Sequence, residues 1–172
     1  MPSSNLVLAH AVVAMVAETH PQSVLDVGPG FGKYGVLIRE YVRPTRLDAI
    51  EAEPRYVARF PWLEAIYDTV MVGDVTTDLS AVDLDSYDVV LLADVLEHVN
   101  HDAGAALLDR ISGRAVICTP RDFFQNPEAS EYPFECHRSV WTAQEIAAVR
   151  PLECEDVFAS TIGGVLVRTA PR

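Results

Sequence analysis

A buried-strand pattern that runs directly into a glycine-rich turn constrains the fold of this chain more than any other feature. Residues 24–27 are mostly apolar, and Gly28, Gly30 and Gly32 follow at once. Glycine permits positive φ angles and lets the main chain approach a ligand closely, as a strand-to-helix crossover around a nucleotide-type ligand requires. Lys33 stands where a strict dinucleotide fingerprint has its last glycine. The pattern therefore favours a ligand without a pyrophosphate.

Acidic residues follow the next two strand patterns. The first pattern ends in Glu51, and the second is followed by Asp74 and Val75. An acid at the end of the strand after the glycine turn is placed to accept hydrogen bonds from ribose hydroxyls. Asp74, one strand further along, could accept a hydrogen bond from an adenine amino group. These acids predict a nucleoside site that either S-adenosylmethionine or NAD would satisfy.

An acid also interrupts the first strand pattern. Asp26 lies among apolar residues, where a carboxylate is costly unless it is hydrogen-bonded. The amides of the glycine turn or the ammonium group of a ligand could supply the partner. We expect Asp26 to take part in cofactor binding, and the alternative is that it braces the turn without touching the ligand.

Strand and helix patterns alternate along the chain, which is typical of a doubly wound α/β sheet. We expect a leading helix within residues 1–20 and a single domain over residues 1–172. The segment 162–164 is short and carries two glycines, which predicts a hairpin between the last two strands. Strands are expected near 23–28, 46–51, 67–72, 87–93, 113–119, 152–160 and 164–169.

The motifs in this order resemble the class I S-adenosylmethionine-dependent methyltransferases from about residue 23 to the C-terminus. The most specific match is the Asp-Val-Leu-Glu-His sequence at residues 94–98, which is similar to the branch that contains small-molecule O-methyltransferases. The resemblance implies a Rossmann-like seven-stranded sheet in the order 3-2-1-4-5-7-6, with strand 7 antiparallel. It also implies S-adenosylmethionine as cofactor and a role for residues 26–32, Glu51, Asp74 and Asp94 in binding it.

Two histidines are candidate catalytic bases. His98 follows the fourth strand, and His137 lies in the irregular stretch 119–141, which we expect to form the acceptor-side loop. Histidine titrates near neutral pH and could remove a proton from a hydroxyl or an amine acceptor. Asp94, Glu97, His98 and His101 could also bind a divalent ion, but their spacing is not diagnostic. Charged runs after a strand are usually solvated helix starts, so we expect no metal.

The composition of the chain disfavours several classes of binding partner. The formal net charge of −12 disfavours a large phosphate-binding surface, and hence nucleic-acid substrates. Three cysteines without paired short spacing suggest neither a disulfide framework nor a zinc knuckle, which is typical of a cytoplasmic protein. No apolar stretch approaches the length needed to span a membrane. The sequence identifies neither the acceptor nor the oligomeric state.

The sequence therefore predicts a methyltransferase acting on a small-molecule or sugar-like acceptor, with O-methylation slightly favoured. Two alternatives stay open. One is a nicotinamide-dependent oxidoreductase, which the glycine turn alone would permit. The other is a non-catalytic subunit that binds S-adenosylmethionine in a complex.

Overall fold

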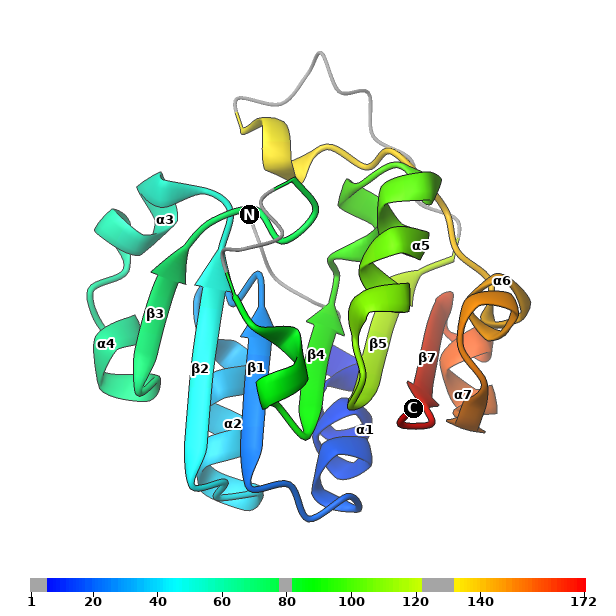
Figure 1. Ribbon diagram of the computed structural model, residues 1–172, viewed down its shortest axis with the longest axis horizontal. Helices are drawn as coiled ribbons and strands as arrows, with labels where there is room; N and C mark the ends of the chain where they lie inside the picture. Colours follow the sequence, from blue (N-terminus) through cyan, green and yellow to red (C-terminus); the bar gives the residue numbers. More distant parts are fainter. Residues whose placement is uncertain (1–5, 78–81, 122–131) are drawn as a thin grey trace.

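A seven-stranded sheet in the order β3-β2-β1-β4-β5-β7-β6 forms the centre of the molecule. The computed structural model describes residues 6–77, 82–121 and 132–172. Strands β1 to β5 run parallel, and β7 pairs antiparallel with both β5 and β6. Figure 1 shows the sheet between two layers of helices, with the carboxyl ends of the parallel strands at the top. The predicted fold class and strand order are confirmed.

The strand bounds agree closely with the predicted ranges for most of the sheet. The strands are β1 (Ser23–Val27), β2 (Arg46–Glu51), β3 (Thr69–Val72), β4 (Val89–Ala93), β5 (Arg114–Pro120), β6 (Leu152–Glu155) and β7 (Gly164–Thr169). All five residues of β4 are buried, as expected for a central strand that is covered on both faces. Continuous apolar runs of this kind are why the parallel strands could be located from sequence.

Helices cover both faces of the sheet. One face packs against α1 (Leu6–Ala17), α2 (Lys33–Tyr41), α3 (Pro54–Arg59), α4 (Leu63–Ile66) and α7 (Val157–Thr161), and the other against α5 (His101–Arg110) and α6 (Ala143–Val149). Alternate residues of β1 divide between the two cores, with Val24 in one and Leu25 in the other. Every strand in the middle of the sheet is thereby held from both sides. The loops at its carboxyl edge are supported by a rigid frame.

The region before β7 differs from the prediction. Residues 152–160 do not form one strand, because β6 ends at Glu155 and α7 begins at Val157. The side chain of Asp156 accepts a hydrogen bond from the backbone N–H of Phe158 at 2.8 Å and so caps the new helix. Gly163, at φ 84°, follows the end of that helix. The last two strands are antiparallel as expected, but a helical turn joins them and not a tight hairpin.

The helix α1 (Leu6–Ala17) lies within residues 1–20, where a leading helix was expected. In α1, Leu8, Val12 and Val16 are buried against the sheet. The described part of the chain contains no helix that is both long enough and apolar enough to cross a bilayer.

Candidate functional site

A cavity of about 570 Å³ opens at the carboxyl edge of the parallel strands. Its walls come from the residues that follow β1, β2, β3, β4 and β5, together with the segment 134–138. In doubly wound sheets this edge is where ligands bind, beside the point at which the strand order reverses. Here β1 lies between β2 and β4, so the cavity sits at that reversal. Its volume is within the usual range for small-molecule sites.

The glycine turn forms one wall of the cavity. Gly28 and Gly30 line it, with φ angles of 67° and 52°. These left-handed angles are strained for residues with a Cβ atom, so glycine is required to present the bare main chain to the cavity. Gly32, at φ 80°, does not line the cavity. A Cβ atom there would lie 2.9 Å from side-chain carbons of Leu63 and Ile66, so Gly32 serves the packing of α2 against α4.

Glu51 lies at the end of β2 and lines the cavity beside the glycine turn. Its carboxylate accepts hydrogen bonds from the backbone N–H of Gly30 at 3.3 Å and of Glu53 at 2.9 Å. Burial raises the pKa of Glu51, and the two backbone N–H groups oppose this effect. Because a carboxylate can accept about four hydrogen bonds, Glu51 can hold the turn and still accept bonds from a ligand.

Asp74 and Val75 follow β3 and line the cavity. One carboxylate oxygen of Asp74 accepts hydrogen bonds from the backbone N–H and the hydroxyl of Thr76, at 2.8 and 2.6 Å. This local turn fixes the side chain and leaves the second oxygen to a ligand. Glu51, Asp74 and the glycine turn therefore share one cavity, as the predicted nucleoside site requires.

Asp26 has a partner that the sequence did not suggest. It is buried, it is not among the residues that line the cavity, and it accepts a hydrogen bond from the Tyr67 hydroxyl at 2.5 Å. Burial raises its pKa to about 7, while the bond from Tyr67 lowers it and the Glu51 charge raises it. Gly35 makes room for this contact, since a Cβ atom there would lie 2.3 Å from the Tyr67 hydroxyl oxygen.

The motif after β4 forms the opposite wall. Asp94 adopts a left-handed backbone conformation at φ 55°, which is uncommon for a residue with a side chain. The short helix η2 (Leu96–His98) follows, and Asp94, Glu97 and His98 all line the cavity. Glu97 is buried, and its side chain accepts a hydrogen bond from the Thr119 hydroxyl at 2.8 Å. Its pKa is raised by burial and then by the neighbouring Asp94 carboxylate.

The two predicted catalytic histidines are in contact. The rings of His98 and His137 meet edge to face, with their centroids 4.9 Å apart. Burial and the nearby His137 ring lower the pKa of His98 to about 4, so the His98 imidazole is neutral at neutral pH. A neutral imidazole offers a nitrogen lone pair to a proton or to a cation.

Hydrogen bonds join the segment that carries His137 to the motif after β4. The backbone N–H groups of Arg138 and Ser139 donate to the carbonyl of Glu97 at 2.6 and 3.2 Å. The Ser139 hydroxyl and the Trp141 indole N–H donate to the carbonyl of Leu96 at 2.9 and 3.2 Å. Four bonds thus fix the position of His137 relative to His98, although the two residues are far apart in sequence.

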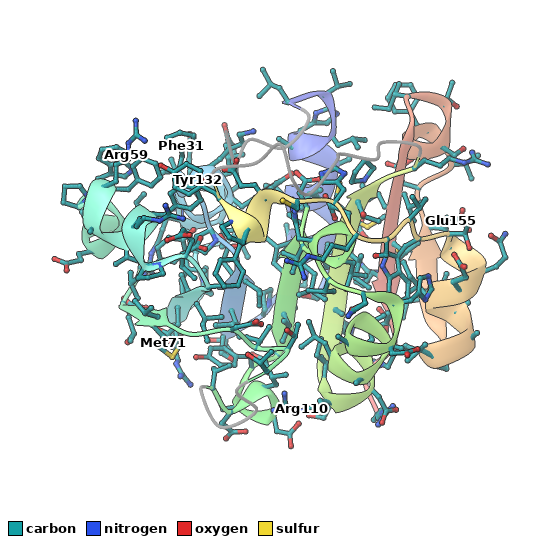
Figure 2. The ribbon with its side chains drawn as sticks, turned by 90° about the horizontal axis from the view of Figure 1, so that it is seen from above. Phe31, Arg59, Met71, Arg110, Tyr132 and Glu155 are labelled. Atoms are coloured by element: carbon teal, nitrogen blue, oxygen red, sulfur yellow. The ribbon has the colours of Figure 1, made fainter. Side chains whose placement is uncertain are left out.

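Aromatic residues close the rim of the cavity near α3. The ring of Tyr132 stacks on Tyr56 with centroids 5.2 Å apart, and the Tyr56 hydroxyl is hydrogen-bonded to Glu135. Figure 2, which looks onto the carboxyl edge, shows Phe31 and Tyr132 together at this end of the molecule. Tyr56, Glu135 and Phe31 line the cavity. The described end of the predicted acceptor-side loop therefore reaches the site, while residues 122–131 of that loop lie outside the described residues.

His101 points to a different environment. Its ring stacks on Trp141 with centroids 3.9 Å apart, and it lies 3.6 Å from a carboxylate oxygen of Glu145. It does not line the cavity. His101 is thus separated from His98 despite their proximity in sequence.

Sequence reasoning missed two residues of this region and gave a third only one possible role. Tyr67 and Tyr56 gave no local signal, because each acts on a partner from a distant segment. Glu97 was considered only as a possible ligand of a divalent ion, together with Asp94, His98 and His101. Its place beside His98 was the available signal.

Comparison with solved structures identifies the fold. A protein of Pyrococcus horikoshii OT3, PH0226, matches with a TM-score of 0.70 and 15% identity over 97% of this chain and 89% of that one. The N-terminal domain of EvdMO1, crystallised in the presence of SAH (S-adenosylhomocysteine) and D-fucose, gives 0.66 and 16% over 99% and 85%. An O-methyltransferase family protein from Burkholderia thailandensis gives 0.65 and 14% over 95% and 56%.

No family model matches the sequence, and no curated protein matches it. The structural likeness is therefore a likeness of fold at low sequence identity. This chain has the seven-stranded α/β fold of the S-adenosylmethionine-dependent methyltransferases, with a cavity at the edge of the sheet where that fold binds ligands.

Proposed function

We propose that this protein transfers a methyl group from S-adenosylmethionine to a small-molecule or sugar-like acceptor, with a hydroxyl oxygen as the favoured target. One observation carries the proposal. A single cavity joins a glycine turn and two ordered carboxylates on one side to a pair of contacting histidines on the other. The first side suits an adenosine-type donor, and the second suits an acceptor that must lose a proton.

The residues of the first side fit S-adenosylmethionine. Gly28 and Gly30 present main chain without Cβ atoms to the cavity, where the methionine part would lie. Glu51 would accept hydrogen bonds from the ribose hydroxyls, and Asp74 and Val75 would contact the adenine. Asp94 lies where this wall meets the histidines, near the expected position of the sulfonium. When bound, the cofactor supplies an electrophilic methyl group.

Asp26 supports this wall without lining the cavity. Its hydrogen bond with Tyr67 ties β1 to the end of α4, so it would position the glycine turn. We assign it a bracing role, which was the alternative reading of its sequence position.

His98 and His137 supply the chemistry on the acceptor side. Methyl transfer from a sulfonium needs alignment of the acceptor and exclusion of water more than it needs reactive groups. The contacting His98 and His137 rings and the stacked Tyr56 and Tyr132 rings would contribute to both. A neutral His98 can receive a proton from an acceptor hydroxyl, either directly or through a water molecule.

Two features favour a small acceptor. One similar structure was crystallised with SAH and D-fucose and another is an O-methyltransferase family protein, which is consistent with a hydroxyl-bearing substrate. The net charge of −12 opposes close approach of a polyanion such as nucleic acid.

Calorimetric titration with S-adenosylhomocysteine and with NADH tests the donor assignment. We expect micromolar binding of S-adenosylhomocysteine and none of NADH. The reverse result would indicate an oxidoreductase.

Methyl incorporation by the isolated chain across a panel of hydroxyl and amine acceptors then tests catalysis. Binding of S-adenosylhomocysteine without turnover of any acceptor would favour the non-catalytic subunit.

A further inference from the structure

The acceptor-side wall holds a cluster of metal-ligand residues. Glu97, His98 and His137 each offer a ligand atom, and these atoms all lie within 4.8 Å of one another. The residues come from two segments, η2 and the chain after η4 (Pro133–Glu135). Zinc and similar ions bind nitrogen and oxygen at about 2.0–2.2 Å, so two ligands of one ion lie at most about 4.2 Å apart. An inward shift of less than one ångström would bring the set to bonding distance.

The cluster is held before any ion binds. The backbone hydrogen bonds from Arg138 and Ser139 to the Glu97 carbonyl fix the two segments together. His98 is hydrogen-bonded to the backbone of Cys136, while its buried Nδ1 atom has no hydrogen-bond partner among the described residues. A histidine that binds a metal commonly anchors one ring nitrogen on a backbone carbonyl in this way and leaves the other for the ion.

The local charge also favours a cation. The side chain of Glu97 is 1% exposed, and it forms a hydrogen bond with the carboxyl group of Asp94. Glu97 is buried and Asp94 is half-buried, and two neighbouring carboxyl groups attract a positive charge. A bound divalent ion would supply that charge and would also give the unpartnered His98 nitrogen a partner.

We propose that Glu97, His98 and His137 bind one divalent first-row transition ion, with Asp94 beside it, and that this ion binds the hydroxyl group of the methyl acceptor. The mixed nitrogen and oxygen ligands suit ions between Mn²⁺ and Zn²⁺ better than Ca²⁺, which takes six to eight oxygen ligands. Three protein ligands leave open positions. Because all three residues line the cavity, those positions face the substrate.

The assignment of a role to the ion rests on the proposed function. An acceptor hydroxyl bound to the ion would lose its proton to water more readily, since a divalent ion lowers the pKa of a bound oxygen. The oxygen would then form a bond to the donor methyl carbon as the bond from that carbon to sulfur breaks. The products are a methyl ether and S-adenosylhomocysteine. With the ion bound, the histidines act as ligands and the proton leaves to solvent, which replaces the proton transfer to His98 proposed for the chain without an ion.

Titration of the metal-free chain with Co²⁺ tests the site directly, because visible absorption bands of Co²⁺ report nitrogen and oxygen ligands. We expect one ion per chain. His137→Ala and Glu97→Gln should each weaken binding by about 100-fold, because each removes a ligand or its charge. His101→Ala is the matched control, since His101 lies close in sequence but stacks on Trp141 away from the cluster; it should bind Co²⁺ like the wild type.

Titration of each variant with S-adenosylhomocysteine shows that it is folded and keeps the two proposals apart. Unchanged S-adenosylhomocysteine binding together with lost Co²⁺ binding supports the site. No Co²⁺ or Mn²⁺ binding by the wild type at millimolar concentration, or binding that neither variant weakens, overturns it. If the wild type binds Co²⁺ but not S-adenosylhomocysteine, the proposed function fails and the metal site stands. If chelated enzyme keeps full turnover, the ion has no role in catalysis.

Discussion

The two walls of the cavity are built in different ways. On the wall proposed for the donor, Glu51 ends β2 and Asp74 follows β3. Their hydrogen bonds are mostly local, as between Asp74 and Thr76 or Glu51 and Glu53, and Glu51 also accepts one from Gly30 in the glycine turn. On the acceptor wall, η2 and the segment around His137 meet across a long stretch of chain and are joined by backbone hydrogen bonds. The first wall depends on strand ends, whereas the second depends on tertiary contacts. Substitutions on one wall should therefore change the function proposed for that wall and leave the function of the other wall unchanged.

The largest expected effect is on stability and comes from Asp26, which is buried beside the donor wall and does not line the cavity. Asp26 has a pKa of about 7 in the folded chain, against about 3.9 when unfolded. The folded state therefore retains a proton that the unfolded state releases between these values, so stability falls as pH rises from about 4 to about 7. The free energy of unfolding could decrease by about 4 kcal/mol because of Asp26 alone.

Urea unfolding of the wild type and Asp26→Asn between pH 4 and 8 measures this contribution. Asparagine can still accept the Tyr67 hydroxyl but does not titrate. The wild-type free energy of unfolding should decrease with pH relative to that of the variant. The pKa of His98 is lowered by folding, so His98 makes the free energy of unfolding rise with pH below about 6.5. Because this contribution is the same in both proteins, it cancels when the curve of the variant is subtracted from that of the wild type. Parallel curves would show that Asp26 does not titrate in this range.

The next effect concerns Glu51 on the donor wall. Glu51→Ala removes a charged acceptor of the Gly30 amide and of the proposed ribose contacts. Hydrogen bonds to charged groups contribute about 1.5–3 kcal/mol, so affinity for S-adenosylhomocysteine should fall about 100-fold by calorimetry. The exposed Glu40→Ala on α2 is the control. Co²⁺ binding should be unchanged in both, and a loss of Co²⁺ binding in Glu51→Ala would show that the two walls are not independent.

A smaller effect is expected on the acceptor wall. Ser139→Ala removes the hydroxyl bond to the Leu96 carbonyl and one of the two acceptors of the Trp141 indole N–H. A net loss of about 1 kcal/mol should loosen the position of His137 and lower turnover about fivefold to tenfold. The affinity for S-adenosylhomocysteine should not change. Val140→Ala, an exposed neighbour, should behave like the wild type. Equal loss of cofactor affinity and turnover in Ser139→Ala would contradict the separation of the walls.

The smallest effect is expected at Asp74. Asp74→Asn can keep the turn with Thr76, but its amide group would face the adenine amino group. We expect S-adenosylhomocysteine to bind about fivefold more weakly, since one neutral hydrogen bond is worth about 1 kcal/mol. The control is the exposed Asp85→Asn, which changes the charge equally. An unchanged affinity in Asp74→Asn would remove Asp74 from the adenine contact.

The sequence by itself determined the architecture and the donor wall. Continuous apolar runs located the parallel strands, and strand ends placed Gly28, Glu51 and Asp74 at one edge of the sheet, because parallel strands finish on the same side. The helix α7 escaped prediction, since the Asp156 cap competes with an apolar pattern that also suits a strand.

Tertiary structure decided the rest. Asp26 receives its hydrogen bond from Tyr67, and the cluster of Glu97 and His98 is completed by His137. Figure 1 shows the segment after η4 crossing above the strand ends. Contacts of this kind join residues that no local spacing relates, because they depend on how the loops fold back over the sheet. The sequence suggested four residues between 94 and 101 as possible ligands of a divalent ion. In the folded chain His101 stacks on Trp141 and lies away from the other three.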